Sequence, residues 1–125
     1  METVTPFKAD LDHIVISVAD IQRAVTFYRD VVGFKIGRSD EAFRFAQFDF
    51  GSVSLRLVGE SEADKNLGRA RNFAVGFAVA DVQAAHDDWV SRGVNFQMPP
   101  TRQPWGAVMA RFADPEGNIL YLVQE

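Results

Sequence analysis

Four side chains with useful chemistry lie in otherwise apolar segments of the sequence: His13, Arg56, Arg111 and Tyr121. An imidazole and a phenol can exchange a proton with a ligand, and an arginine fork can hold a carboxylate, phosphate or enolate oxygen. An arginine on a central strand must be paired or solvated, because an isolated buried charge is costly. Arg56 therefore has two interpretations: an internal ion pair with an acid such as Asp49 or Glu41, or an anion-binding role.

Other common chemistries find no support in the sequence. Cysteine is absent, which excludes a disulfide, a thiolate metal site and a thiol nucleophile. No Ser-His-Asp arrangement and no glycine-rich phosphate loop can be identified. His86 falls on an expected helix away from the other candidates and is interpreted as a surface or helix-edge residue.

Charge and hydropathy narrow the partners and the compartment. The net charge of −4 and the lack of a basic stripe argue against nucleic acid and against an anionic membrane surface as partners. No apolar run approaches membrane-spanning length, and the first residues lack a signal pattern. The cytoplasm is the expected location.

A repeated segment organises the chain. Segment 18–24, VADIQRA, returns as segment 79–85, VADVQAA. In each copy an apolar strand precedes an aspartate suited to cap a helix, and a glycine, Gly33 or Gly93, is expected to end that helix. A whole supersecondary unit is therefore duplicated, and two copies fill the chain.

The same order of elements is expected in both copies. We predict one domain over residues 1–125, with repeats at about 11–58 and 73–125 and a linker at about 59–72. The first repeat is expected to hold strand 11–18, helix 21–32 and strands 34–38, 43–50 and 52–58. The second is expected to hold strand 73–79, helix 82–92 and strands 94–97, 108–112 and 118–124. Prolines are expected to keep residues 98–106 out of helix and sheet as a loop.

A duplicated βαβββ unit that opens LDHIVISV at residues 11–18 and closes FADPEGNILY at residues 112–121 resembles the vicinal oxygen chelate superfamily. That superfamily includes glyoxalase I, extradiol dioxygenases, epimerases, fosfomycin-modifying enzymes and bleomycin-resistance proteins. The resemblance extends from about Leu11 to Glu125. It implies an α+β fold in which two βαβββ repeats form a curved mixed sheet around a groove, with helices on the convex face. The fold hosts many chemistries and does not by itself imply one.

The resemblance also implies where a metal would bind. Metal-dependent members carry one ligand on each of four strands, pointing into the groove, and the corresponding positions here are His13, Arg56, Ala74 and Tyr121. Only His13 matches the usual ligand. A catalytic divalent metal typically needs two imidazoles and a carboxylate with open positions for substrate, so we expect no metal and no other cofactor.

Strand alternation supports the same assignment of faces. If His13 faces the groove, the period of two sends the neighbouring apolar residues to the opposite face, as a core requires. These expected core residues are Ile14, Ile16, Val18, Leu55, Leu57, Val75, Phe77, Val79, Leu120 and Leu122. The groove side then holds a mixture of small and polar residues that suits the lining of a cavity.

The predicted ligand site consists of His13, Phe48, Phe50, Arg56, Trp105, Met109, Arg111 and Tyr121. The phenylalanines at 43, 45, 48 and 50 cannot all share a face, because the spacing changes parity between 45 and 48. One pair is expected to line the groove. Trp105, between Pro104 and Gly106, is expected to overhang the ligand. Arg56, Tyr121, His13 and Trp105 are expected to converge on one cavity.

Three functions follow from this site. The favoured hypothesis is metal-free binding of a small aromatic, anionic or carbonyl-bearing molecule, in the manner of bleomycin-resistance proteins, although an arginine would repel bleomycin itself. The alternative is a metal-independent lyase, isomerase or hydrolase in which Arg56 steadies an oxyanion while His13 or Tyr121 moves a proton. A glyoxalase- or dioxygenase-type metalloenzyme is less favoured. A homodimer is expected, because an open sheet leaves apolar edges that need cover.

Overall fold

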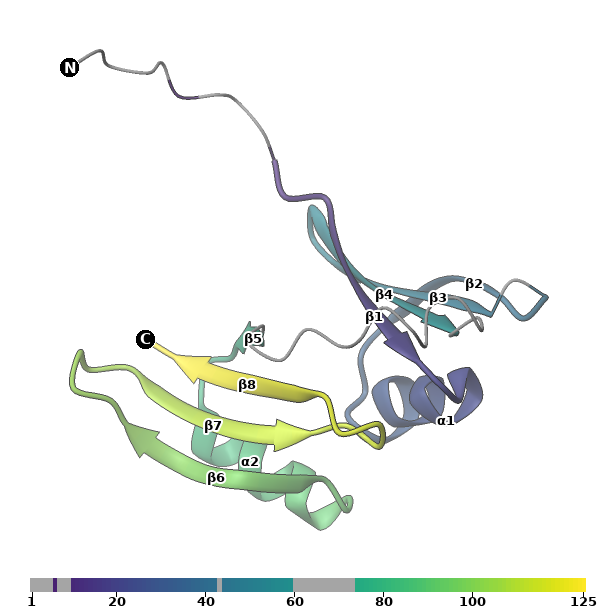
Figure 1. Cartoon of the computed structure of the whole chain (residues 1–125). Coiled ribbons are helices and arrows are strands. Elements are labelled where there is room, and N and C mark those ends of the chain that lie inside the picture. The colour runs from purple at the N-terminus through teal and green to yellow at the C-terminus, as the bar shows by residue number, and fades with distance from the viewer. Residues whose placement is uncertain (1–5, 7–9, 43, 60–73) are drawn as a thin grey trace.

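The computed structural model describes residues 6, 10–42, 44–59 and 74–125. In the first repeat the elements are β1 (His13–Val18), α1 (Ile21–Val25), a π-helical turn (Thr26–Val31), β2 (Ile36–Asp40), β3 (Phe45–Phe50) and β4 (Val53–Gly59). In the second repeat they are β5 (Val75–Ala78), α2 (Val82–Ser91), β6 (Asn95–Arg102), β7 (Val108–Ala113) and β8 (Ile119–Gln124) (Figure 1). Gly59 ends β4, and the rest of the predicted linker lies outside the described residues, as does Phe43.

Each repeat forms its own four-stranded mixed sheet. The first sheet has the order β1-β4-β3-β2 and the second the order β5-β8-β7-β6. In each, the first strand runs parallel to the last, and the remaining neighbours are antiparallel. The α+β class and the two βαβββ units are confirmed. The strands are hydrogen-bonded into two sheets, where we expected one curved sheet, and in the described residues no ladder joins β1 to β5.

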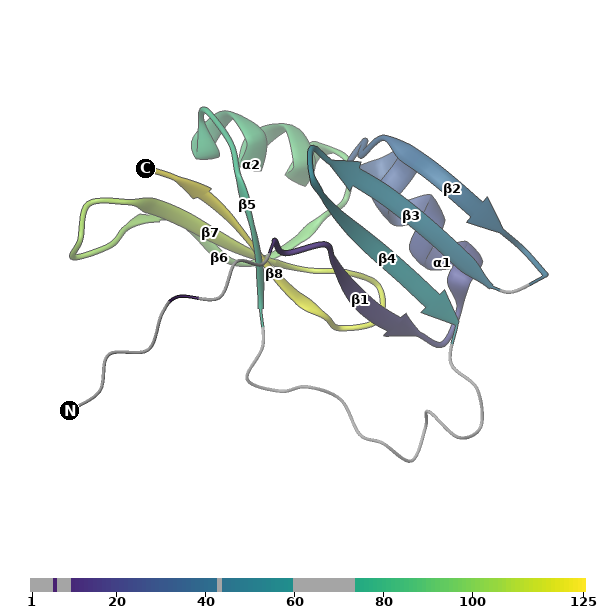
Figure 2. The ribbon, with the colours of Figure 1, turned by 90° about the horizontal axis from the view of Figure 1, so that it is seen from above.

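One helix packs on one face of each sheet, α1 on the first and α2 on the second (Figures 1 and 2). Side chains of both repeats then meet in one continuous core. The ring of Phe34 contacts those of Phe77 and Trp89, with centroids 4.9 and 6.0 Å apart, and Phe50 lies 5.3 Å from Phe77. The repeats are therefore joined through their helix-packed sides. In the described ranges, neither helix is long and apolar enough to cross a membrane.

The two helices begin and end alike but differ in the middle. Asp20 and Asp81 each accept a hydrogen bond from the backbone N–H three residues on, at 3.0 Å, which confirms both caps. Gly33 and Gly93 follow the helices with positive φ, as a stop requires. One residue more lies between cap and glycine in the first repeat than in the second. The π-helical turn at Thr26–Val31 absorbs that extra residue, because its wider turn closes on the fifth residue instead of the fourth.

Strand β6 differs from the prediction at its prolines. We expected residues 98–106 to form a loop, but β6 continues through Pro99 and Pro100, and only residues 103–107 connect it to β7. Proline cannot donate to a ladder, so it is tolerated on an edge strand or at an irregularity. Both conditions hold here, since β6 is the edge of the second sheet and its pairing register shifts after Met98.

A buried hydrogen-bond network links the second repeat's last turn to the first repeat's helix. Asp114, 5% exposed, accepts at 2.7 Å from the hydroxyl of Tyr28. The same carboxylate accepts from Glu116 N at 2.9 Å and from Asn118 N and Nδ2, both at 2.8 Å. Burial, followed by the charge of Asp114 and this hydrogen bond, raises the pKa of Tyr28 far above its ordinary value. Tyr28 is therefore held in its protonated, donating form.

Glu116 completes the connection at the start of α1. Its carboxylate accepts from the backbone N–H groups of Ala19 and Asp20, at 2.9 and 3.1 Å, and from Arg23 Nη2 at 2.7 Å. Burial alone would raise the pKa of Glu116, but these hydrogen bonds outweigh it and hold the pKa below its usual value. We call Arg23, Tyr28, Asp114 and Glu116 the inter-repeat clasp.

Candidate functional site

Each sheet has a second face that neither of the described helices covers, which we call its open face. Cross-strand partners place corresponding residues of the two repeats in corresponding rows: Val15, Arg56 and Gln47 on the first sheet, and Gly76, Tyr121 and Arg111 on the second. Arg56 and Tyr121 therefore occupy equivalent positions, as the sequence predicted. The alternating apolar residues of the same strands pack against the helices, with Leu57 and Leu122 fully buried.

A small polar cluster lies at the β1 edge of the first open face. The guanidinium of Arg56, whose side chain is 26% exposed, approaches Asp12 Oδ2 at 3.5 Å through Nη2 and Ser54 Oγ at 3.3 Å through Nε. The same Asp12 oxygen lies 2.6 Å from His13 Nδ1. The hydrogen bond with His13 has the largest effect on the pKa of Asp12 and lowers it; burial opposes this, and the charges of His13 and Arg56 lower the pKa further. His13 and Arg56 thus share one carboxylate.

The partner of Arg56 is therefore neither of the acids considered from sequence. Asp49 instead accepts a hydrogen bond from Gln47 Nε2 at 2.8 Å. Asp12 is 76% exposed, and its contact with Arg56 is long for a charge-assisted hydrogen bond. A ligand anion can compete for a guanidinium held in this way.

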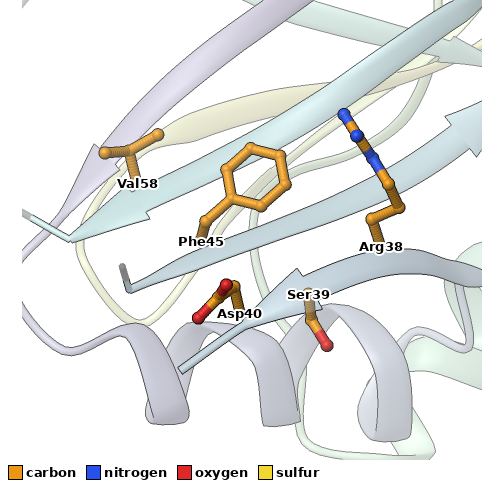
Figure 3. A pocket seen from close by; sticks show the side chains of 5 residues that line it. All are labelled: Arg38, Ser39, Asp40, Phe45 and Val58. Atoms are coloured by element: carbon orange, nitrogen blue, oxygen red, sulfur yellow. The ribbon is translucent and has the colours of Figure 1, made fainter. Parts of the chain in front are cut away.

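A concavity of about 420 Å³ lies on the same face, toward β2. Phe45 and Val58 form its apolar part, and Arg38, Ser39 and Asp40 complete its lining. Figure 3 shows Phe45, Val58 and Arg38 projecting to one side of the strands, with Ser39 turned toward the helix beneath. Val58 follows Arg56 by two positions on β4, so the concavity and the Arg56 cluster lie on one face.

The open face of the second sheet carries Arg111 beside Tyr121, with Met109 two positions before Arg111 on β7. All three are half-buried. Met98 of β6 is the partner of Arg111 on its other side. The structure thus brings Met109, Arg111 and Tyr121 together on one face, as predicted, but on a different sheet from His13 and Arg56.

Two predicted aromatic site residues face the core instead. Phe48 is fully buried and lies 5.9 Å from the ring of Tyr28, and Phe50 packs on Phe34 and Phe77. The parity change between Phe45 and Phe48 was identified correctly, but the choice of pair was wrong. Of the described phenylalanines at 45, 48 and 50, Phe45 lies on the open face, because its partner Val58 shares the face of Arg56.

Trp105 also lies elsewhere. It is 71% exposed in the short connection between β6 and β7, whose tip points away from the first sheet in both views of the ribbon (Figures 1 and 2). In the described part of the chain, neither His13 nor Arg56 forms a hydrogen bond or ion pair with Tyr121 or Arg111. The structure therefore places His13 and Arg56 on a different sheet from Tyr121, and it holds the connection that carries Trp105 away from the first sheet.

The residues at the four implied metal positions do not fit a divalent ion. They provide one imidazole at His13, a guanidinium at Arg56, a methyl group at Ala74 and a phenol at Tyr121. The nearest carboxylate, Asp12, already bridges His13 and Arg56. Across the described ranges, no three or more His, Asp or Glu side chains gather in a way that could hold a metal.

The sequence interpretation missed three residues of the open faces: Asp12, Phe45 and Gln47. Asp12 directly precedes His13, so a search for a carboxylate near the imidazole along the chain would have found it. Gln47 shares the parity of Phe45, and both lie on β3 opposite residues of the Arg56 face. Correct assignment of that one strand would have found both.

Comparisons of the sequence and of the structure with known proteins agree on one family. The sequence model of the Glyoxalase/Bleomycin resistance protein/Dioxygenase superfamily matches residues 10–122. A Bacillus subtilis (strain 168) protein, named only as uncharacterized protein YraH, is 32% identical over 113 residues, which cover 82% of this chain and 88% of that protein. The metallothiol transferase FosB of Staphylococcus saprophyticus is 26% identical over 112 residues, covering 86% of this chain and 72% of FosB.

A solved structure shows the same fold. The crystal structure of a member of the same superfamily from Sphaerobacter thermophilus DSM 20745 superposes with a TM-score of 0.78 at 28% sequence identity. The superposition covers 94% of this chain and 98% of that one. The likeness therefore includes both repeats.

Proposed function

Because the chain belongs to the Glyoxalase/Bleomycin resistance protein/Dioxygenase superfamily, we propose that it binds a small aromatic, anionic or carbonyl-bearing molecule on its open faces without a metal ion. The observation that carries the proposal is the first open face. There a half-buried arginine, only loosely paired with an exposed aspartate, shares a face with a concavity lined by an aromatic ring. A volume of about 420 Å³ falls within the range of small-molecule sites.

The chemistry of this face favours an anionic or carbonyl group on an aromatic body. Arg56 can exchange its long contact with Asp12 for a charge-assisted hydrogen bond to the ligand. Phe45 and Val58 offer apolar surface to a ring. Arg38 and Asp40 both line the concavity and offset each other's charge, so the preference against a cationic ligand rests on Arg56.

Three probes that share one ring test this preference: benzoate, benzamide and benzylamine. A ligand that binds only the native state raises Tm, so benzoate should raise it most and benzylamine least. Arg56→Met should weaken benzoate binding by about 1–3 kcal/mol. Arg29, whose guanidinium is ion-paired with Asp30 on the exposed side of the first helix, supplies the matched control Arg29→Met. A stronger response to benzylamine than to benzoate would contradict the proposal.

The metal-free part of the proposal has its own test. Elemental analysis of the protein purified from its host should find less than one equivalent of divalent metal, and added metal should not raise Tm. An equivalent of zinc, iron, manganese or nickel that is lost in His13→Ala would overturn this part.

One observation favours catalysis as a second candidate function. His13 has a carboxylate partner on Nδ1, at 2.6 Å, which is the arrangement that orients a general base. Arg56 is placed to steady a developing oxyanion beside it. This supports a metal-independent lyase or isomerase that removes a proton next to a carbonyl, or a hydrolase.

Proton exchange tests this candidate directly. Exchange of the methylene protons of phenylpyruvate in D₂O, followed by NMR, should be faster with the protein than without it and return to background in His13→Ala. His86 also has an adjacent aspartate, at 3.0 Å, but lies on α2, so His86→Ala is the matched control and should retain the activity. Equal loss in both variants would argue against a specific role for His13.

We also propose a cytoplasmic homodimer. Among the described strands, β1 and β5 are the outer strands of their sheets, and Val15 on β1 is 49% exposed, so each chain presents a sheet edge with an apolar side chain. Analytical ultracentrifugation should show a dimer at micromolar concentration that Val15→Lys weakens. A monomer at every concentration would contradict the dimer, and cell fractionation tests the location.

A further inference from the structure

Arg111 is the most unusual side chain outside the Arg56 cluster. It lies on β7, between Met98 of β6 and Tyr121 of β8. Its sequence neighbours Ala110 and Phe112 are both fully buried on the helix-packed face. Alternation therefore sends Arg111 to the open face of the second sheet.

The guanidinium of Arg111 is incompletely satisfied. Its Nε is buried without a hydrogen-bond partner, and in the described part of the chain Arg111 takes part in no ion pair. Arg56, in contrast, contacts both Ser54 and Asp12. An unpaired buried donor costs free energy, more so when it is charged, and native proteins keep few of them. Such a group calls for a partner that the described residues do not supply.

The surroundings of Arg111 specify the chemistry of that partner. On β7 itself and on the adjacent strands, the residues that share its face include the apolar or neutral Met98, Thr101, Met109, Ile119, Tyr121 and Val123. No carboxylate is among them. Gly76, the partner of Tyr121 on β5, leaves open space, since a Cβ added there would meet only Tyr121 Cβ, at 4.0 Å. The face combines one cationic fork, the phenolic hydroxyl of Tyr121 and two polarisable thioethers.

From this arrangement we infer that the open face of the second sheet is a binding site for a carboxylate with an apolar body, anchored by Arg111. The carboxylate accepts from the two Nη groups of the guanidinium, a bidentate pairing that fits its planar geometry. The hydroxyl of Tyr121 donates to the same group. Met98 and Met109 contact the apolar body, because thioether side chains adapt to its shape. This inference rests on the proposed ligand-binding function and names an anchor and a ligand class for the second sheet.

The arginine Nε–Hε cross-peaks in a ¹⁵N NMR spectrum report on each guanidinium separately. Arg111→Lys and Arg56→Lys each remove one cross-peak and so assign it. Benzoate should shift the Arg111 cross-peak to saturation, whereas the isosteric neutral benzamide should leave it in place. A shift of the Arg56 cross-peak alone would overturn the inference while leaving the proposed function intact. If benzoate moves neither cross-peak and does not raise Tm, both fail.

Two variants separate ligand binding from a structural role. Arg111→Lys keeps the charge but loses the fork, and should weaken benzoate binding by about tenfold or more. Arg111→Met removes the unsatisfied donor, so the ligand-free protein should keep or raise its Tm. A marked fall in the Tm of Arg111→Met would show a structural partner and overturn the inference. So would an Arg111 cross-peak that moves on protein dilution without benzoate, because a second copy would then be its partner.

Discussion

The two repeats have the same order of elements and the same caps, yet they secure the starts of their helices in different ways. In the second repeat, Gln124 of β8 accepts from Val82 N at 2.9 Å, so the repeat supplies its own partner. In the first, the N–H groups of Ala19 and Asp20 donate to Glu116, which belongs to the other repeat. Duplication has therefore produced two units of unequal independence. The first repeat depends on the second for the hydrogen-bond acceptor at the start of its helix, and the inter-repeat clasp provides that acceptor.

The largest effect is expected at the centre of the clasp. Asp114→Ala removes the acceptor of four hydrogen bonds and should lower the free energy of unfolding by roughly 3–5 kcal/mol, as measured by urea denaturation. Asp114→Asn is the control that keeps shape while removing charge, and it should cost less. A loss below about 1 kcal/mol in Asp114→Ala would contradict the idea that the first repeat depends on the clasp for its stability.

Tyr28→Phe tests the part of the clasp that crosses between repeats. It leaves the last turn its own hydrogen bonds but deletes the hydroxyl that Asp114 accepts at 2.7 Å. The expected cost is about 1–3 kcal/mol in the free energy of unfolding. Tyr121→Phe, on an open face, provides the comparison and should change stability by less than about 0.5 kcal/mol. Equal effects in the two variants would contradict a special role for Tyr28.

Glu116→Gln tests the clasp through pH. The folded-state pKa of Glu116 lies below its ordinary value near 4.5, so its contribution is complete above that pH and is lost as the pH falls through the folded-state pKa. The variant should be about 1 kcal/mol less stable at neutral pH, and its difference from the wild-type protein should shrink below pH 4.5. A difference that stays constant with pH would show that the carboxylate charge is unimportant.

The smallest effect is expected where the repeats touch at the surface. Arg92, after α2, donates to the carbonyl of Val31 at 3.2 Å and pairs with Asp88 at 2.9 Å, both in exposed positions. Arg92→Met should change the free energy of unfolding by less than about 0.5 kcal/mol. A larger loss of the free energy of unfolding, measured by urea denaturation, would show that the repeats are also held together by Arg92, outside the clasp.

Local sequence signals predicted the fold well. The duplicated aspartate and glycine positions located both helices, and alternation assigned Leu57 and Leu122 to the core. The π-helical turn required a comparison of the spacing in the two copies, which differ by one residue. The extension of β6 through Pro99 and Pro100 depends on its place at a sheet edge, which only the tertiary arrangement determines.

The candidate site was less predictable because it depends on which faces meet. Strand alternation correctly placed Arg56, Arg111 and Tyr121 on open faces. Once one residue of a strand is assigned to a face, the period of two assigns all the others. Phe48 and Phe50 were misassigned because β3 carries phenylalanine on both of its faces, at 45, 48 and 50, so residue type alone does not tell the core face from the open face. The separation of Arg56 from Tyr121 arises from the packing of the two repeats through their helices, for which no short motif in the sequence codes.

The clasp also has a consequence for how the protein is made. The bond between Tyr28 and Asp114 spans 86 positions, and that between Ala19 and Glu116 spans 97. At a synthesis rate of ~5–20 residues per second, a ribosome needs roughly 4–17 s to travel from the codon of Tyr28 to the codon of Asp114. During that interval the nascent first repeat has its own strands but lacks the carboxylates that complete its helix. Its apolar helix-packed face stays exposed until the second repeat emerges. Because exposed apolar surface promotes aggregation, the emerging chain is most vulnerable to aggregation, and most in need of chaperones, at this stage.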